Sequence, residues 1–226
     1  MDAAALCRNG RIAGALYLVV VLTGMFCLAY VPSQLGEGIA GASAHAGLFR
    51  AGIAAFLVMQ VAFLLLPFAL YRVLGDVDRR AAILMVVLAV VSVPIGLVAV
   101  THRMEALSLL ESAGNGVTEA MVAAFVLCLQ RYGHGLRIAS LFWGLWLLPF
   151  GWLVLRSGRL PRVLGWLLVL GGIGYVVQVF GGLVPGFADS SLVRYVRMPA
   201  AIGEIGSCLW LLMFGARAGL QQLSRH

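Results

Sequence analysis

Residues 137–180 read RIASLFWGLWLLPFGWLVLRSGRLPRVLGWLLVLGGIGYVVQVF, which is two apolar runs joined by a short basic turn. The runs 141–155 and 163–184 contain no charged residue. Each approaches the roughly 20 residues that a helix needs to cross about 30 Å of hydrocarbon. Residues 156–162 combine three arginines with a glycine and a proline, which end a helix and favour a turn in water. The stretch therefore predicts a transmembrane helical hairpin.

The composition of the whole chain agrees with that prediction. Of 226 residues, 62% are hydrophobic and 11% are charged, whereas about a quarter of a soluble domain is charged. We therefore expect an all-α, polytopic integral membrane protein with a single transmembrane domain over residues 1–226. The chain contains no lysine, which excludes Schiff-base chemistry and the lysine of a phosphate-binding P-loop. The net charge of +7 comes from arginines in loops and at helix ends, a pattern typical of membrane topology and not of nucleic-acid binding.

The apolar runs predict six transmembrane helices. They are expected at residues 12–31, 48–70, 81–100, 136–155, 163–184 and 199–220. A seventh run, residues 118–129, reaches only about 18 Å as a helix, so we expect one short extra helix on the outer face. The first run resembles a signal peptide, but it is too long for one, and we expect an uncleaved helix.

Arginine counts in the loops predict the orientation. With the N-terminus inside, ten arginines lie on the cytoplasmic side and six lie outside. The cytoplasmic arginines are then Arg8, Arg11, Arg72, Arg79, Arg80, Arg156, Arg159, Arg162, Arg217 and Arg225. The outer ones are Arg50, Arg103, Arg131, Arg137, Arg194 and Arg197. We expect a bacterial cytoplasmic membrane protein with both termini cytoplasmic.

Small residues and prolines recur inside the predicted helices. The fifth and sixth carry small residues at helical spacing, namely Gly171, Gly174 and Gly182, and Gly203, Gly206 and Ser207. Such faces favour close packing against neighbouring helices. Pro67, Pro94 and Pro149 fall inside predicted helices and favour bends. The four cysteines form no C-x-x-C pair, so we expect neither a disulfide framework nor a structural zinc site.

Several segments carry a resemblance to a known family. They are RIAGALY at 11–17, FRAG at 49–52, LYRVL at 70–74, FWGLW at 142–146, GWLVLRSGRLPRVLG at 151–165, Gly203-Glu204 and LWLL at 209–212. The chain resembles the bacterial membrane family known as domain of unknown function 4386. The resemblance implies a multi-pass bacterial membrane protein and implies no activity. The loop at 36–47 departs from the family, because Glu37 is its only acidic residue.

One carboxylate, Glu204, lies inside a predicted helix, where a charge facing lipid would cost several kcal/mol. It must face protein or water. Other ionisable residues are predicted at the same outer level, and they are Arg50, His102, Arg103, Glu105, His134 and Arg137. The hypothesis that follows is that Glu204 pairs with Arg137 or Arg50.

Several functions remain open for this outer polar cluster. An ion-pair network would lock helix ends together. Arg50 and Arg137 would suit a lipid headgroup or a small anion. A metal-dependent hydrolase would use His45, His102 and His134, although no tight motif supports it. A small transporter is a further alternative, weakened because no inverted repeat is evident. We expect no cofactor and no metal, and a structural or binding role more than an enzymatic one.

Overall fold

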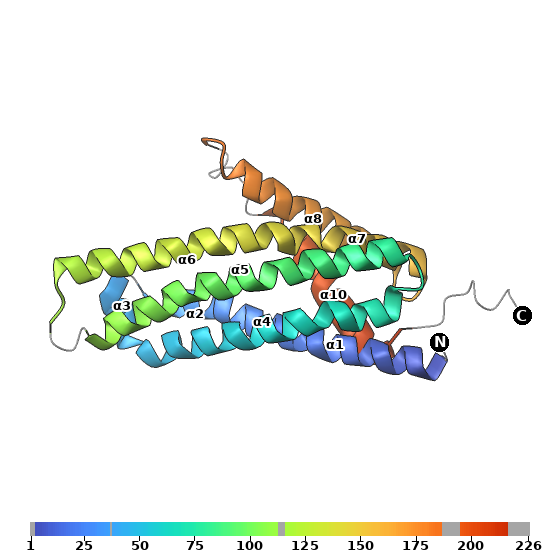
Figure 1. Ribbon diagram of the computed structural model, residues 1–226, viewed down its shortest axis with the longest axis horizontal. Helices are drawn as coiled ribbons and strands as arrows, with labels where there is room; N and C mark the ends of the chain where they lie inside the picture. Colours follow the sequence, from blue (N-terminus) through green and yellow to red (C-terminus); the bar gives the residue numbers. More distant parts are fainter. Residues whose placement is uncertain (1–2, 37, 113–115, 187–194, 217–226) are drawn as a thin grey trace, which may run out of the picture. The chain divides into compact units, whose positions relative to one another are not determined.

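The computed structural model describes residues 3–36, 38–112, 116–186 and 195–216. Within these ranges the protein is helical and contains no strand. The elements, labelled in Figure 1, are α1 (Ala3–Met25), a π-helical turn η1 (Phe26–Tyr30), α2 (Val31–Gln34), α3 (Gly38–Ala44), α4 (Ala46–Leu74), α5 (Arg79–Ser112), α6 (Glu119–Leu145), α7 (Leu147–Ser157), α8 (Arg162–Gly181) and α10 (Met198–Phe214).

Five helical stretches in the described chain are long and apolar enough to cross a membrane. They are Ala3–Gln34, Ala46–Leu74, Arg79–Ser112, Glu119–Ser157 and Arg162–Gly181. The apolar helix α10 is shorter, at 17 residues. The prediction of an all-helical fold is therefore confirmed over the described residues, and the five apolar helices are consistent with a multi-pass membrane protein.

Residues 118–129 are not a separate outer helix, and that prediction is wrong. Residues 119–129 form the first turns of α6, which continues without a break to Leu145. The polar segment after Leu129 suggested a loop, but it contains no proline, and polarity alone does not end a helix. The interruption comes instead at Trp146. Pro149 lies three residues later and has no N–H to donate to the carbonyl of Leu145.

Other helix ends also differ from the expected ones. The predicted sixth helix ends at Phe214 instead of residue 220, because Gly215 has φ +62° and turns the chain away. The helix predicted at 81–100 extends to Ser112, because residues 101–112 contain no glycine or proline that would end it earlier. Residues 217–220, and Arg194, Arg217 and Arg225 of the orientation set, lie outside the described residues.

Contacts divide the chain into two units. Unit 1 comprises Met1–Leu18, Phe63–Ser92 and Ser140–His226, and unit 2 comprises Val19–Ala62 and Val93–Ala139. The boundaries fall inside α1, α4, α5 and α6, so these helices contribute to both units. The expectation of one transmembrane domain stays a prediction.

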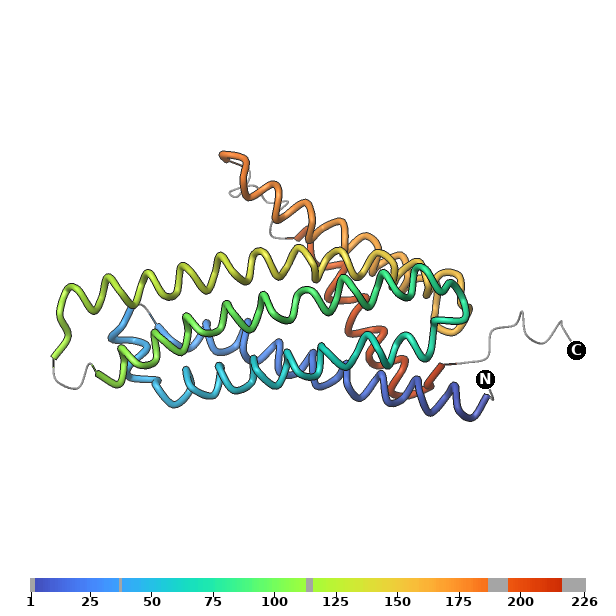
Figure 2. Tube along the Cα trace, in the orientation of Figure 1, coloured from blue at the N-terminus to red at the C-terminus, as the bar shows by residue number. Residues whose placement is uncertain are grey.

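Unit 1 is held together by close helix packing. A Cβ added at Gly171 of α8 would lie 2.3 Å from the Cα of Ala200 in α10, and one added at Gly206 would lie 2.6 Å from Leu164. The small-residue faces therefore let two backbones approach, as predicted. The ring of Trp146 stacks on Phe150 at 5.4 Å between centroids. Figure 2 shows the chain of this unit reversing between α7 and α8.

Unit 2 contains the shorter helices α2 and α3 together with parts of α1, α4, α5 and α6. A buried amide, Gln60, donates to the carbonyl of Val93 at 3.1 Å and so joins α4 to α5. Gly96 faces the same amide, and a side chain there would overlap it. Hydrogen bonds between helices are worth about 0.6–2 kcal/mol in membranes. This contact fixes α4 against α5.

Candidate functional site

A pocket of about 260 Å³ lies within unit 2. Its lining is mostly apolar and includes Pro32, Leu35, Phe49, Phe125 and Leu129. Phe125, Leu129 and Tyr132 follow one another at i, i+4 and i+7 on α6, so one face of that helix supplies one wall. Among the described residues of the lining, the charged one is Arg103 of α5.

The Arg103 side chain is buried, at 3% exposure. Its guanidinium carbon lies 4.5 Å from the centroid of the Phe49 ring and 5.2 Å from that of the Tyr132 ring. The Nε and Nη1 atoms have no hydrogen-bond partner among the described residues. The hydroxyl of Tyr132 is likewise without a partner in the described chain. Two donor groups therefore line one pocket with their hydrogen-bonding capacity unused.

The aromatic rings do not neutralise this charge. A cation–π contact contributes about 0.5–2 kcal/mol. Burying an arginine without a counter-charge costs several kcal/mol. Among the described residues Arg103 has no counter-charge, and a bound anion would supply one.

Part of the predicted polar cluster is brought together in unit 2. Nδ1 of His102 lies 3.0 Å from Oε2 of Glu105, as the i, i+3 spacing on α5 predicts. The thiol of Cys128 on α6 donates to the same carboxylate oxygen at 3.7 Å. The side chain of Glu105 is 54% exposed, so this group is a surface contact between α5 and α6.

The other predicted members lie apart from that contact. Arg50 pairs with Glu111 at 2.7 Å, and both side chains are more than half exposed. Such a pair contributes about 0–1 kcal/mol. His134 and Arg137 are both exposed on α6. Arg50 therefore forms a surface ion pair, and the structure gives it a glutamate partner from α5.

The hypothesis of a metal-dependent hydrolase used His45, His102 and His134. In the ranges that the structure describes, no three side chains of His, Cys, Asp or Glu gather closely enough to hold a metal ion. His45 lies in the turn before α4, where its Nδ1 is 3.1 Å from the carbonyl oxygen of Gly41. The three histidines are not brought together.

Glu204 belongs to unit 1, whereas Arg50 and Arg137 belong to unit 2. Its hydrogen-bond donor is the hydroxyl of Tyr17 on α1, at 3.2 Å from Oε1. Glu204 is therefore held by a neutral phenol where an arginine was expected. Its side chain is partly buried, so the inference that it faces protein agrees with the structure.

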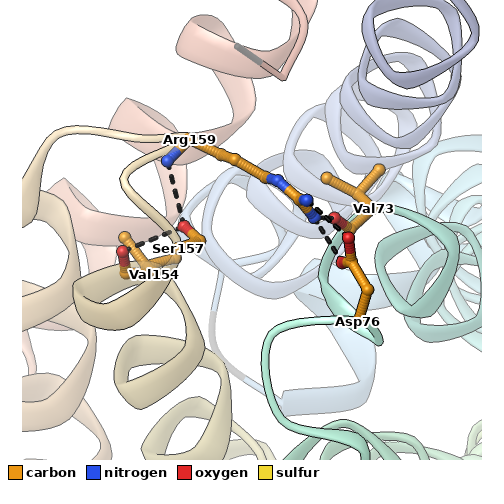
Figure 3. Close-up of polar contacts among 5 residues, drawn as sticks. All are labelled: Val73, Asp76, Val154, Ser157 and Arg159. Carbon is orange, nitrogen blue, oxygen red and sulfur yellow. Dashed lines mark hydrogen bonds and ion pairs between the residues drawn. The ribbon is translucent and has the colours of Figure 1, made fainter. Parts of the chain in front are cut away.

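Unit 1 also contains a buried arginine, Arg159, in the turn between α7 and α8 (Figure 3). Its Nη1 and Nη2 atoms donate to the two carboxylate oxygens of Asp76, each at 2.6 Å. Nη1 also donates to the carbonyl of Val73 near the end of α4. The backbone N–H of Arg159 donates to Ser157 Oγ at 3.1 Å. The clamp ties the α7–α8 turn to the α4–α5 turn.

The sequence places this clamp by local backbone chemistry. Gly158 has φ +63° and caps α7, a conformation that suits glycine. Pro161 stands directly before α8, where its missing N–H leaves no intrahelical bond unmade. The segment RSGRLPR, read from sequence as a topology signal, therefore also forms a structural clamp.

The clamp carboxylate Asp76 and its neighbour Asp78 both have lowered pKa values. The hydrogen bonds from Arg159 lower the pKa of Asp76 below its ordinary value. The pKa of Asp78 is lowered chiefly by the backbone N–H of Ala81 and further by that of Arg80. Asp78 Oδ1 accepts both bonds at 3.1 Å and so caps the N-terminus of α5.

The sequence placed Arg103 at the outer level among the ionisable residues, but Arg103 was not predicted to be a ligand-binding residue. A signal was present. Arg103, Ala106 and Leu110 recur at i, i+3 and i+7, and all three are buried. Arg103 thus shares the face of α5 that packs inward, while His102 and Glu105 flank it.

The chain belongs to the family described as Domain of unknown function (DUF4386), whose family model matches residues 12–215. The resemblance seen in the sequence motifs is confirmed by that match. A search of curated proteins and a search of solved structures each found no match.

Proposed function

We propose that this DUF4386 member is a bacterial cytoplasmic membrane protein that binds the anionic headgroup of a lipid, or a small anion of the same chemistry, in the unit 2 pocket. The observation that carries the proposal is the buried guanidinium of Arg103, which lines the pocket with two nitrogen atoms unbonded in the described chain. An anion at this point would accept from both donors.

The lining favours a particular kind of anion. Arg103 supplies one positive charge, and the described residues that line the pocket include no second cation. Tyr132 adds one hydroxyl donor, and the remaining walls are largely apolar. A volume of about 260 Å³ is below the usual range for drug-sized ligands, which is about 300–1,000 Å³. A singly charged phosphodiester headgroup with an apolar body fits these properties.

The proposed topology has six crossings, with α10 as the sixth and both termini in the cytoplasm. A 17-residue helix is about 26 Å long, slightly less than the hydrocarbon core, so slight thinning of the bilayer would accommodate it. The bias of arginines toward the inner loops supports the orientation. With this topology the Arg103 pocket belongs to the outer leaflet, at the level of lipid headgroups.

Reporter fusions test the topology. Alkaline phosphatase, which is active only outside the cytoplasm, is expected to be inactive when fused after Asp76 or after Arg159. Green fluorescent protein at the same positions is expected to fluoresce. The reverse pattern would place the Asp76–Arg159 clamp outside and contradict the proposed orientation.

Thermal unfolding in detergent tests the binding site. Added phosphatidylglycerol is expected to raise the melting temperature of the full chain, and phosphatidylcholine is not. A ligand at 100 times its dissociation constant stabilises by about 2.7 kcal/mol. Arg103→Met should abolish the response. Arg50→Met should keep it, because Arg50 is an exposed arginine of the same unit that does not line the pocket.

Two further arms identify the source of the anion. If inorganic phosphate alone reproduces the response, the ligand is a free anion.

Glu37 stands in the sequence between Gly36 and Gly38, which line the pocket, and Glu37 itself lies outside the described residues. Glu37→Gln is expected to keep the lipid response. A wild-type protein that responds equally to both lipids, or an Arg103→Met variant that still discriminates between them, would overturn the proposal.

A further inference from the structure

A second polar position, Glu204, lies in unit 1 within apolar surroundings. It is the seventh residue of α10, about 9 Å from the start of that helix. Ile202, Ile205 and Leu209 on the same helix are exposed at 56%, 38% and 46%. In a membrane these side chains would face lipid. Cys208, four residues on and on the same face of α10 as Glu204, is buried, so the carboxylate points into protein and away from bulk water.

The titratable groups around Glu204 offer no full counter-charge. Tyr17 on α1 is completely buried and donates its hydroxyl to Oε1 at 3.2 Å. Cys208 on α10 and Tyr175 on α8 are also within electrostatic range of this pair. Arg197, a described cation in the same unit, is exposed and lies over the Tyr175 ring, 5.4 Å from its centroid. Within the described chain Glu204 makes no ion pair.

An ionised carboxylate in such a place would lack both hydration and a cation, and taking up a proton removes that cost. A protonated carboxyl keeps one oxygen as an acceptor for Tyr17 and carries its proton on the other. We propose that Glu204 and Tyr17 form a proton-binding site inside the membrane, with the Glu204 carboxyl protonated at neutral pH. The site is independent of the Arg103 pocket, because all of its residues belong to unit 1.

Labelling with dicyclohexylcarbodiimide tests this site. The reagent partitions into the apolar phase and adds the O–H of a protonated carboxyl across one C=N bond. The O-acylisourea rearranges to a stable N-acylurea with no leaving group. Peptide mass spectrometry of the full chain in membranes should find one adduct at Glu204 at pH 7. The rate should fall about tenfold per pH unit once the carboxyl ionises, because only the neutral form reacts.

Three variants separate this site from other carboxyls. Glu204→Gln should reduce labelling at this peptide to background, and Glu111→Gln, which removes an exposed ion-paired carboxyl, should leave it unchanged. Tyr17→Phe removes a donor that favours the ionised form, so its labelling should persist to higher pH than in the wild type. A wild-type Glu204 that stays unlabelled, or labels at a rate independent of pH, overturns the proposal. A Tyr17→Phe profile identical to the wild type removes Tyr17 from the site.

Discussion

Arg159 in unit 1 and Arg103 in unit 2 are almost equally buried, at 5% and 3% exposure, yet their surroundings differ. Arg159 donates to both oxygens of Asp76 and to a helix-end carbonyl. Arg103 lies over two aromatic rings beside a pocket, with Nε and Nη1 unbonded in the described chain. The difference shows that burial alone does not separate a structural arginine from a binding arginine. Nε is unbonded in both side chains, but of the two arginines only Arg159 pairs with a carboxylate in the described chain.

The largest effect is expected at the clamp. Asp76→Ala leaves the buried Arg159 guanidinium without its carboxylate, which should lower the free energy of unfolding by about 2–3 kcal/mol. The value is below that of a fully buried pair because the Asp76 side chain is 51% exposed. Unfolding by sodium dodecyl sulfate titration from mild detergent measures it.

Glu111→Ala is the matched control for the clamp. It also removes the carboxylate of an arginine pair, but both partners are more than half exposed. The expected loss is within about 0.5 kcal/mol. Equal losses at Asp76 and Glu111 would show that the Arg159 clamp contributes no more than a surface pair.

The second prediction has the opposite sign. Arg103→Met replaces an unpaired buried charge with an apolar side chain of similar length. Without lipid, the free energy of unfolding should rise by about 1–2 kcal/mol, because the lost cation–π contacts are worth less than the desolvation that is relieved. The same detergent titration measures it, with Arg159→Met as the control that lowers stability. A loss of stability in Arg103→Met would mean that the chain itself supplies a counter-charge, with Glu37, between the pocket-lining Gly36 and Gly38 in the sequence, as the candidate.

The hairpin was predictable because its signals are local. Charge-free runs, an αL glycine and a proline before α8 each act within a few residues. Helix lengths were predicted poorly where polarity was taken as a helix end. The helix α6 continues through the polar residues between Leu129 and Leu136, and α10 ends before Gly215 although a helix was predicted to residue 220. Helix ends follow backbone geometry more than hydropathy.

The site was less predictable than the fold because its contacts are long-range. Asp76 and Arg159 are 83 positions apart, and the residues around each of them in the sequence do not indicate that the two side chains pair. Arg103 contacts Phe49 and Tyr132 on two other helices. Charge counting recognised both arginines as topology signals, and only packing distinguishes their roles.

A third prediction concerns a smaller contribution at the same turn as Asp76. Asp78→Ala removes the cap that accepts hydrogen bonds from Arg80 and Ala81. The expected loss is about 1 kcal/mol. Asp78→Asn should recover most of it, because an amide oxygen also caps a helix. The comparison separates a neutral backbone role from the charge pairing at Asp76, where Asp76→Asn should not recover the loss.

The smallest effect is the pH dependence that separates the two arginines. Arg159 lowers the folded-state pKa of Asp76, so the stabilisation is fully present above the unfolded value of about 3.9 and is lost as pH falls through the folded value. The difference in unfolding free energy between wild type and Asp76→Asn should be constant from pH 7 to about 5 and shrink below about pH 4. The difference between wild type and Arg103→Met should stay flat over the same range, because no carboxylate in the described chain pairs with Arg103. If the difference between wild type and Arg103→Met changes with pH, a titrating group of the chain pairs with Arg103. Both arginines would then be paired with a group of the protein.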